Sequence, residues 1–454
     1  MRRITALIIT AGATLWAQPR ALTIAEAVQN ALRNYPSVRV SQEQVNAAAA
    51  RIDLARTAYL PRVDAIAQAN RATRNNVFGL LLPQNTIPSI SGPVLGTNNL
   101  GTAWGSAIGT LVSWEPFDFG LRGAAIDAAV VARAQAQATV KRTQYDVAVA
   151  ASDAYLTLVA AEQTTLAAEA AVSRAEVIAR STQALVDAQL RPGADASRAA
   201  AELAAARTQL IQARQAVAVA RASVSQFVGR EPAQVVTISE RLLQTPPAAP
   251  VAPMDLNANP LINEQTAVLA QAMARLRELE RSYFPRFYLQ GGAYSRGTGA
   301  ETDGRRLGGL NGLAPNVQDY ALGLTVTFPI MDRASIRARE AEQSATIRAE
   351  TARVAQIATD LRAQWNRAAA ILDSARQVAA NTPVELMSAR AAVDQASARY
   401  QSGLGTIDAV AEAQRLLTQA EIDDALARLG IWRGLLGIAT AAGDLQPFLT
   451  EASQ

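Results

Sequence analysis

The fold is decided by residues 121–190, LRGAAIDAAVVARAQAQATVKRTQYDVAVAASDAYLTLVAAEQTTLAAEAAVSRAEVIARSTQALVDAQL. No proline occurs between Pro116 and Pro192, and alanine, glutamine and arginine separate the apolar residues. These features predict one helix of about seventy residues, which at about 1.5 Å per residue would be on the order of 100 Å long. A helix of that length needs packing partners along it, because most helical stability in proteins comes from an apolar face buried by neighbours.

A heptad pattern runs through the second half of this helix. Its positions advance by alternating steps of four and three, at Tyr145, Val149, Ser152, Leu156, Val159, Gln163, Leu166, Ala170, Ser173 and Val177. This spacing predicts the seam of a left-handed coiled coil. Small seam residues let helices approach closely, which favours a wall of many packed helices over a dimer with a thick core. A long helix with an ordinary packed face is the alternative interpretation.

Composition excludes several classes of function. The 454 residues include no cysteine and no histidine. This removes disulfides, thiol nucleophiles, histidine acid–base chemistry, the usual zinc sites and a lipid anchor on cysteine. The formal charge is +4, and arginines alternate with acids along helices, as in residues 277–281, which favours a solvated face over nucleic-acid binding. With no recognisable catalytic constellation, we expect neither an enzyme nor a cofactor.

The first residues, 1–21, have the layout of a secretory signal peptide. Two arginines precede the apolar run 4–16, and small residues follow at Ala17 and Ala21. The sequence leaves cleavage after Ala17 or after Ala21 open. No other stretch reaches 18 consecutive apolar residues, so we expect a mature chain that leaves the cytoplasm without a transmembrane helix.

The rest of the chain is an internal duplication. Pro36 and Pro61 recur as Pro260 and Pro285, with the same offset for both pairs. Such a shared offset is typical of a repeated unit. The prolines of TPPAAPVAP forbid helix and favour an extended connector between the two copies. The duplication divides the mature chain into repeat 1, the connector and repeat 2, at residues 22–244, 245–253 and 254–454.

Both repeats show the same order of elements: a helix, two extended segments around a loop, a very long helix, a tight turn and a return helix. The first helix ends before Pro61 or Pro285, because the residue before a proline is driven out of the helical region. The predicted strands cover residues 62–72, 103–115, 286–296 and 319–329. The predicted long and return helices cover 121–190 and 195–228 in repeat 1, and 333–401 and 406–440 in repeat 2.

The fourth predicted strand alternates most clearly. One face carries Tyr320, Leu322, Leu324, Val326 and Phe328, and the other carries Ala321, Gly323, Thr325 and Thr327. This pattern is typical of a transmembrane β-strand, although a soluble sheet on a helical layer would look similar. Four strands cannot close a barrel alone, and unpaired backbone groups in hydrocarbon cost several kcal/mol each. Strands in a membrane would therefore require several chains in one barrel.

Local motifs mark the ends of the long helices. Thr382, Pro383 and Glu385 form a capping box with proline in the first helical position, which predicts that the second long helix stops and restarts near residue 382. Gly193 and Gly403 lie where each long helix must reverse. Glycine readily adopts the left-handed cap that such a turn needs.

The motifs and their order resemble the TolC-like outer-membrane efflux proteins, or outer membrane factors. The shared segments are the opening LTIAEAVQNALRNYP, the YLP and YFP before strands, PFDFG at 116–120 and YQSGLGTIDAVAEAQ at 400–414. The resemblance covers the whole mature chain. It assigns the strand–helix junctions to Pro61, Pro116, Asp118, Gly120, Pro285, Pro329 and Asp332. In the second copy, PIMDRA, Ala334 stands where the family usually has glycine.

This resemblance implies a mainly helical chain with a transmembrane β-barrel portion, built from two repeats of a β-hairpin and a helical hairpin. It implies a homotrimer with twelve strands in one barrel and an α-helical tunnel through the periplasm. The implied function is a passive outer-membrane duct of a tripartite efflux or type I secretion system, with a periplasmic adaptor and an inner-membrane pump as partners. The exported substrate and the pump class (RND, ABC or MFS) stay open. A soluble periplasmic coiled-coil scaffold is the alternative, and alkaline extraction of membranes separates the two.

The resemblance also implies a periplasmic gate at the second turn. Asp408 and Glu412 share a helix face, although acids in the first turns also suit the helix dipole. Glu412 falls where the family's segment carries its last acid. The family's other acid falls on Ala409, so whether Asp408 faces the pore stays open. Tyr400 is implied to make a hydrogen bond that keeps the turn closed, and a ring of carboxylates would attract cations.

Overall fold

The computed structural model describes residues 21–72, 101–247, 254–301, 303 and 305–453. The predicted signal peptide lies outside these residues, except for Ala21. The described chain is mainly helical with one four-stranded antiparallel sheet, so the prediction of a mainly helical chain with a small sheet is confirmed. None of the described helices is both long enough and apolar enough to cross a membrane.

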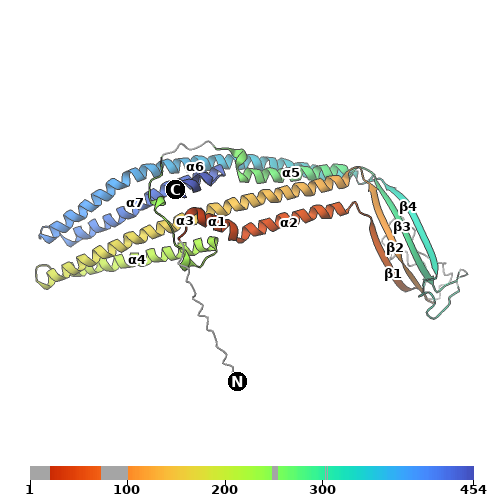
Figure 1. Ribbon diagram of the computed structural model, residues 1–454, viewed down its shortest axis with the longest axis horizontal. Helices are drawn as coiled ribbons and strands as arrows, with labels where there is room; N and C mark the ends of the chain where they lie inside the picture. The colour runs from red at the N-terminus through yellow and green to blue at the C-terminus, as the bar shows by residue number, and fades with distance from the viewer. Residues whose placement is uncertain (1–20, 73–100, 248–253, 302, 304, 454) are drawn as a thin grey trace, which may run out of the picture. The chain divides into compact units, whose positions relative to one another are not determined.

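Two compact units are each built from both repeats. The first unit takes the chain up to Gln42 together with residues 138–264 and 354–454, and the second takes 43–137 and 265–353. The sequence repeats therefore interleave, because the long helix of each repeat contributes to both units. Figure 1 marks the elements along the chain.

The long and return helices lie close to their predicted ranges. The single helix predicted before the first strand of repeat 1 is instead two helices, separated at Tyr35. Those of repeat 1 are α1 (Ile24–Asn34), α2 (Pro36–Thr57), α3 (Leu121–Asp187) and α4 (Gly193–Val228). Those of repeat 2 are α5 (Pro260–Arg281), α6 (Arg333–Gln401), α7 (Ile407–Ala442) and α8 (Gln446–Ser453). The first long helix ends at Asp187 rather than at residue 190, and its return helix begins at Gly193 rather than at residue 195.

The sheet joins the two repeats edge to edge. Its strands lie in the order of the sequence, as Figure 1 shows: β1 (Arg62–Ala72), β2 (Ala103–Phe117), β3 (Arg286–Thr298) and β4 (Val317–Thr327). All three pairings are antiparallel, and the central one, β2 with β3, connects repeat 1 to repeat 2. Within the described part of the chain, the outer edges of β1 and β4 have no strand partner.

A ladder of ion pairs fixes the register of α3 against α4. The pairs are spaced seven residues apart on both helices, at Glu176–Arg207 (2.8 Å), Glu169–Arg214 (3.0 Å) and Glu162–Arg221 (3.4 Å). Equal heptad spacing on both sides identifies an antiparallel coiled coil. Partly exposed pairs contribute less than about 1 kcal/mol each, so they select the register and leave most of the stability to apolar packing.

The predicted seam of α3 is only partly correct. It holds around Leu156 and Val159, which are fully buried. Nearer the turn, the predicted seam residues Leu166 and Val177 are 57% and 56% exposed in the single chain, and alanines such as Ala168 are buried instead. In this part of α3, the row that packs within the single chain is therefore not the predicted one.

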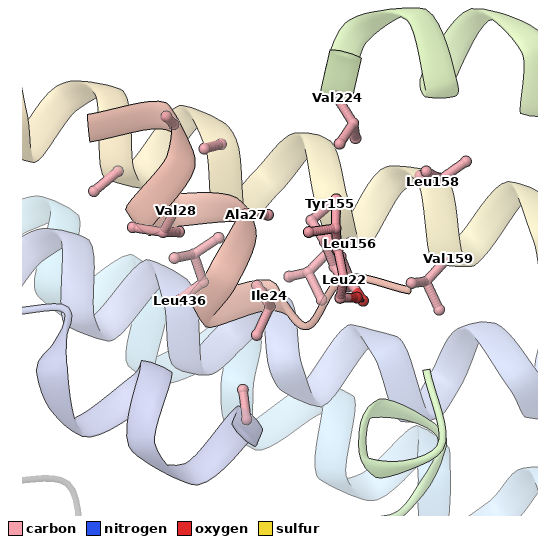
Figure 2. Packing of buried hydrophobic residues seen from close by; sticks show 14 of the residues in the cluster. Leu22, Ile24, Ala27, Val28, Tyr155, Leu156, Leu158, Val159, Val224 and Leu436 are labelled. Carbon is pink, nitrogen blue, oxygen red and sulfur yellow. The ribbon is translucent and has the colours of Figure 1, made fainter. Parts of the chain in front are cut away.

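The largest apolar cluster lies in the first unit, where α1 packs with α3, α4, α7 and α8. Tyr155, fully buried in α3, connects two distant segments: its hydroxyl lies 2.7 Å from the carbonyl oxygen of Leu22 and accepts the N–H of Ile238 at 3.0 Å. Figure 2 shows Leu22 and Tyr155 within this cluster. Burial raises the pKa of Tyr155, so the hydroxyl keeps its proton.

The second long helix does not break near residue 382, and that prediction is wrong. Helix α6 is continuous, with Pro383 inside it. The side chain of Thr382, which a capping box would turn onto the backbone of Glu385, instead donates to Oδ1 of Asp424 in α7 at 3.2 Å. Thr382 and Asp424 are both buried. A buried contact with another helix thus outweighs a local capping preference.

Candidate functional site

Asp118 caps the start of the long helix α3. Its carboxylate accepts the backbone N–H of Gly120 at 3.1 Å and that of Arg122 at 2.7 Å, so it satisfies two donors at the helix start. The chain passes from Asp118 into α3 through Phe119 and Gly120, whose φ angles are 52° and 90°. Glycine takes such a left-handed conformation at little cost, which explains its place in PFDFG.

Arg122 ties the Asp118 cap to the end of the preceding helix. Its Nε donates to Oδ2 of Asp118 at 2.8 Å, and its Nη1 donates to the carbonyl of Ala58 at 3.0 Å. The guanidinium also lies 4.5 Å from the centre of the Tyr59 ring. Burial alone would raise the pKa of Asp118, but hydrogen bonds from Arg122 and the backbone outweigh it and hold that pKa below its usual value.

Aromatic rings join the two repeats at this junction. Phe119 stacks on Phe284 of the YFP segment with ring centres 5.3 Å apart, and Phe117 lies edge-on to Phe287 at 6.0 Å. Pro61 and Pro285 directly precede β1 and β3, Pro116 is the residue before the last one of β2, and Pro329 follows β4. The junction is therefore built from residues that are far apart in the sequence.

The second copy of the junction turns differently. Asp332 directly precedes α6, and its main-chain carbonyl accepts the N–H of Ile336 at 2.9 Å. Within residues 329–334, all of which the structure describes, no φ is positive. Ala334 occupies the position that Gly120 has in the first copy, and a side chain disfavours the left-handed turn found there.

The strand register separates the side chains of the sheet into two faces. Val63 pairs with Val112, and Leu289 pairs with both Trp114 and Leu324, so these apolar residues share one face. On β4 this face carries Tyr320, Leu322, Leu324 and Val326, which are 37% to 88% exposed in the single chain. The opposite face carries Asp64, Gln68, Asn70, Gln290, Asp319 and Thr325. One apolar and one polar face is the pattern of strands between lipid and an aqueous interior.

The turn between α3 and α4 reverses at Gln189 and not at Gly193. Gln189 has a φ of 61°, and the N–H of Leu190 bonds to the carbonyl of Leu185 at 2.8 Å, a Schellman pattern. Gly193 is the first residue of α4, so the left-handed cap predicted for it is wrong. Gln189 gave no signal in the sequence, because a residue with a Cβ rarely takes this conformation.

The turn between α6 and α7 does use glycine. Gly403 has a φ of 83°, and the N–H of Leu404 bonds to the carbonyl of Arg399 at 2.9 Å. The hydroxyl of Thr406 then accepts a backbone N–H of the first turn of α7 at 3.4 Å. Each of the two turns presents a leucine to solvent, Leu190 at 70% and Leu404 at 76% exposure.

Tyr400 links the two turns. Its hydroxyl donates to Oδ2 of Asp195 in α4 at 3.1 Å. Arg191, from the first turn, lies with its guanidinium 4.5 Å from the centre of the Tyr400 ring and donates to the Tyr400 carbonyl. Burial raises the pKa of Tyr400, so the hydroxyl keeps its proton and serves as a donor near neutral pH.

The two acids after the second turn each lie near an arginine. Oδ1 of Asp408 is 3.2 Å from Nε of Arg198 in α4, and Oε2 of Glu412 is 3.3 Å from Nη2 of Arg415 in its own helix. The carboxylate side chains are 72% and 60% exposed, so these pairs contribute about 1 kcal/mol or less. Asp408 has a partner in the other hairpin, whereas the partner of Glu412, Arg415, lies in its own helix.

Arg174 makes a further link between the hairpins, which sequence reasoning missed. Its guanidinium donates twice to Glu421, at 2.9 and 3.1 Å, and once each to Thr418 and Gln414, at 3.1 and 3.0 Å. All three acceptors come from α7. A single arginine on an alanine-rich helix resembles any solvated charge, so only the fold reveals its partners.

The chain belongs to the outer membrane efflux protein family, whose model matches residues 27–230 and 252–444. The two matched segments fall on the two repeats. Membership makes the protein an outer-membrane efflux duct and not an enzyme. No individually curated protein sequence matches the chain.

Solved outer-membrane channels share this fold. The channel OprN is 20% identical, with 94% of this chain and 91% of OprN covered and a TM-score of 0.70. CmeC of Campylobacter jejuni is 15% identical, with 100% and 98% covered and a TM-score of 0.71. MtrE of Neisseria gonorrhoeae, in its open state, is 17% identical, with 93% and 89% covered and a TM-score of 0.66.

Proposed function

We propose that three copies of this chain form one channel, the passive exit duct of a tripartite efflux or type I secretion system. The observation that carries the proposal is the open sheet, whose outer edges on β1 and β4 have no strand partner among the described residues. Open edges are not tolerated in lipid, so the strands of several subunits must close one barrel. Three subunits of four strands make a twelve-stranded barrel, with the apolar face toward lipid and the polar face toward the lumen.

The helical hairpins form the periplasmic part of this channel. Each long helix leads from the strands to a turn, so the turns lie at the periplasmic end. There Leu190 and Leu404 offer exposed apolar side chains to a periplasmic adaptor protein, which connects the duct to an inner-membrane pump. With no cysteine in the chain, the strands alone hold the protein in the outer membrane. A soluble periplasmic scaffold would leave the exposed apolar face of the sheet unexplained.

Glu412 is the proposed source of charge selectivity. Three-fold symmetry would repeat this acid around the axis, and a ring of carboxylates attracts cations. We expect a cation-selective channel in planar bilayers, blocked by multivalent cations from the periplasmic side, with both properties weakened in Glu412→Ala. Asp408→Ala is expected to have the smaller effect, because the family's other acid falls on Ala409 and not on Asp408. Reversal potentials in a salt gradient measure the selectivity.

The control for this experiment is Asp423→Ala, which removes another acid of α7. The carboxylate of Asp423 accepts a hydrogen bond from Gln419 in the same helix. Trimer formation is expected to be intact in all of these variants. Unchanged selectivity and unchanged block in the double variant Asp408→Ala, Glu412→Ala would remove the gate proposal and leave both acids as ordinary helix-start charges.

Tyr400 is proposed to hold the channel closed through its bond to Asp195. Tyr400→Phe deletes the hydroxyl and retains the ring beneath Arg191. A hydrogen bond contributes about 1 kcal/mol net, so we expect the ratio of open to closed channels to rise several-fold in single-channel recordings. Asp195→Asn, which retains an acceptor, is the matched control. An unchanged open probability in Tyr400→Phe would discard this role.

A further inference from the structure

Residues 382–385 carry a local preference that the structure does not follow. Thr382 is a good N-cap, Pro383 suits the first helical position, and Glu385 completes a capping box. These residues nevertheless lie inside the continuous helix α6. Local preference and tertiary structure therefore point to two different conformations of the same segment.

Pro383 is the weak point of the continuous helix. Proline has no N–H, so the carbonyl of Ala379 loses its usual helical donor, and the ring crowds the preceding turn. The buried hydrogen bond from Thr382 to Asp424 holds α6 against α7 at this level. Thr382 is 3% exposed and Asp424 is 7% exposed, so water competes little for this bond.

Asp424 is itself held in place. Its second carboxylate oxygen accepts from Arg428, whose Nη1 donates to the carbonyl of Leu243 at 3.3 Å. A surface recess of about 460 Å³ lies against this group and is lined by Pro383, Leu386, Met387, Arg390, Asp424 and Arg428. A bend of α6 at Pro383 therefore has open space beside it.

The packing between α6 and α7 differs on the two sides of Pro383. On the side away from the turn, a Cβ on Gly434 would lie 2.9 Å from Cα of Leu372, so the two backbones are in close contact. On the side toward the turn, the contact is a small cluster of Ala389, Val393, Ala413, Leu417 and Ala420. The first part is fixed by close backbone packing, and the second is held by apolar side chains.

We propose that α6 is a two-state element switched by the hydroxyl of Thr382. In the straight state this hydroxyl donates to Asp424. In a kinked state it caps a new helix that starts at Pro383 and accepts the N–H of Glu385. The two states exclude each other, because an N-cap has extended backbone angles and the straight helix uses the Glu385 N–H for its own i−4 bond.

The switch deepens the proposed function, on which it rests, because residues 384–401 lead to the turn that carries the gate. This arm is about 27 Å long at 1.5 Å per residue, and kinks at proline exceed about 20°, so the turn would move by about 9 Å. Bending at Pro383 is therefore a built-in movement for opening the periplasmic end.

Spin labels can test the two states, because the chain has no cysteine to remove. Cysteines at Ala188 and Ser402, both exposed, place one label on each turn, and pulsed EPR on the full chain in detergent measures their separation. We expect one distance in the parent chain and a second, displaced by about 9 Å, in Asp424→Ala. Adding Pro383→Ala is expected to abolish the second distance. In a trimer, labels on neighbouring subunits also give distances. Samples that carry only one of the two labels measure these distances between subunits.

Further variants separate hydrogen bonding from charge. Asp424→Asn retains an acceptor for Thr382 and is expected to keep the single distance. Thr382→Val added to Asp424→Ala removes the cap of the kinked state, so it is expected to reduce the second population. Asp423→Ala, on the same helix, is the matched control and is expected to match the parent. Asp424→Leu, of similar volume, is also expected to show the second distance. It replaces Asp424→Ala in the experiment if that variant does not fold.

A single unchanged distance in Asp424→Ala and Asp424→Leu would overturn the switch, as would a second distance that persists after Pro383→Ala. The distances do not depend on conduction. A trimer that conducts ions but shows one distance in every variant therefore rejects the switch alone, whereas a folded monomer in the same samples rejects the proposed function.

Discussion

Arginine in place of Leu324 is expected to destabilise the membrane-inserted protein by about 2 to 4 kcal/mol, the cost of a cation on the lipid face near the bilayer midplane. Leu324 lies within β4 on the apolar face, opposite Leu289, and is 65% exposed in the single chain. The same change at Val326, on the same face, is expected to act in the same direction. The yield of heat-resistant oligomer in outer membranes measures the effect.

Thr325→Arg is the matched control for Leu324→Arg. Thr325 is the next residue along β4 and lies on the polar face, opposite Tyr288. An arginine there would enter the aqueous lumen, so we expect assembly close to that of the parent chain. If Thr325→Arg reduces assembly more than Leu324→Arg does, either the assignment of the two faces of β4 or its assignment to the membrane is wrong.

Loss of the Asp118 carboxylate is expected to cost about 3 to 5 kcal/mol, because Asp118→Ala leaves Arg122 buried without its counter-charge. Both side chains are less than a tenth exposed. Denaturant unfolding of the detergent-extracted protein measures the loss. Asp332→Ala, at the equivalent position of repeat 2, is the control, because the bond from Ile336 to its main-chain carbonyl survives the change. Equal losses of unfolding free energy in the two variants would contradict the role of Asp118 as the counter-charge of Arg122.

The Asp118 cap also predicts a loss of stability in acid. The pKa of Asp118 is lowered in the folded chain, so the unfolded chain binds the proton more tightly. The contribution of the cap is complete above the unfolded pKa of about 3.9 and is lost as pH falls through the lower folded pKa. We expect Asp118→Asn to lose less stability than the parent between neutral pH and pH 3. Equal losses of stability in Asp118→Asn and the parent would show that other titrating groups cause the loss of stability in acid.

The regular elements were predictable because they depend on local patterns. Alternation in the strands and freedom from proline in the long helices indicate their type, and β1 and α6 span 62–72 and 333–401, the ranges that the patterns indicate. The two faces of the sheet follow from the same alternation, because strand side chains point to opposite sides in turn.

Contacts between distant segments were not predictable in this way. The capping box at Thr382 is a real local signal, but Asp424, 42 residues away, competes for the same hydroxyl. Gln189 is left-handed because the hairpin must reverse there, whatever residue occupies the position. Arg174 and Arg198 each pair with an acid of α7, and charge spacing within one helix does not identify a partner in another.

The central claim is that several copies of the chain share one closed barrel, and the number of chains in the membrane-inserted protein tests it most directly. Native mass spectrometry of protein extracted from outer membranes into detergent gives that number without assumptions about shape. We expect a mass of three chains, held together in detergent because each sheet completes its neighbour. A folded monomer that resists alkaline extraction from the membrane would contradict it.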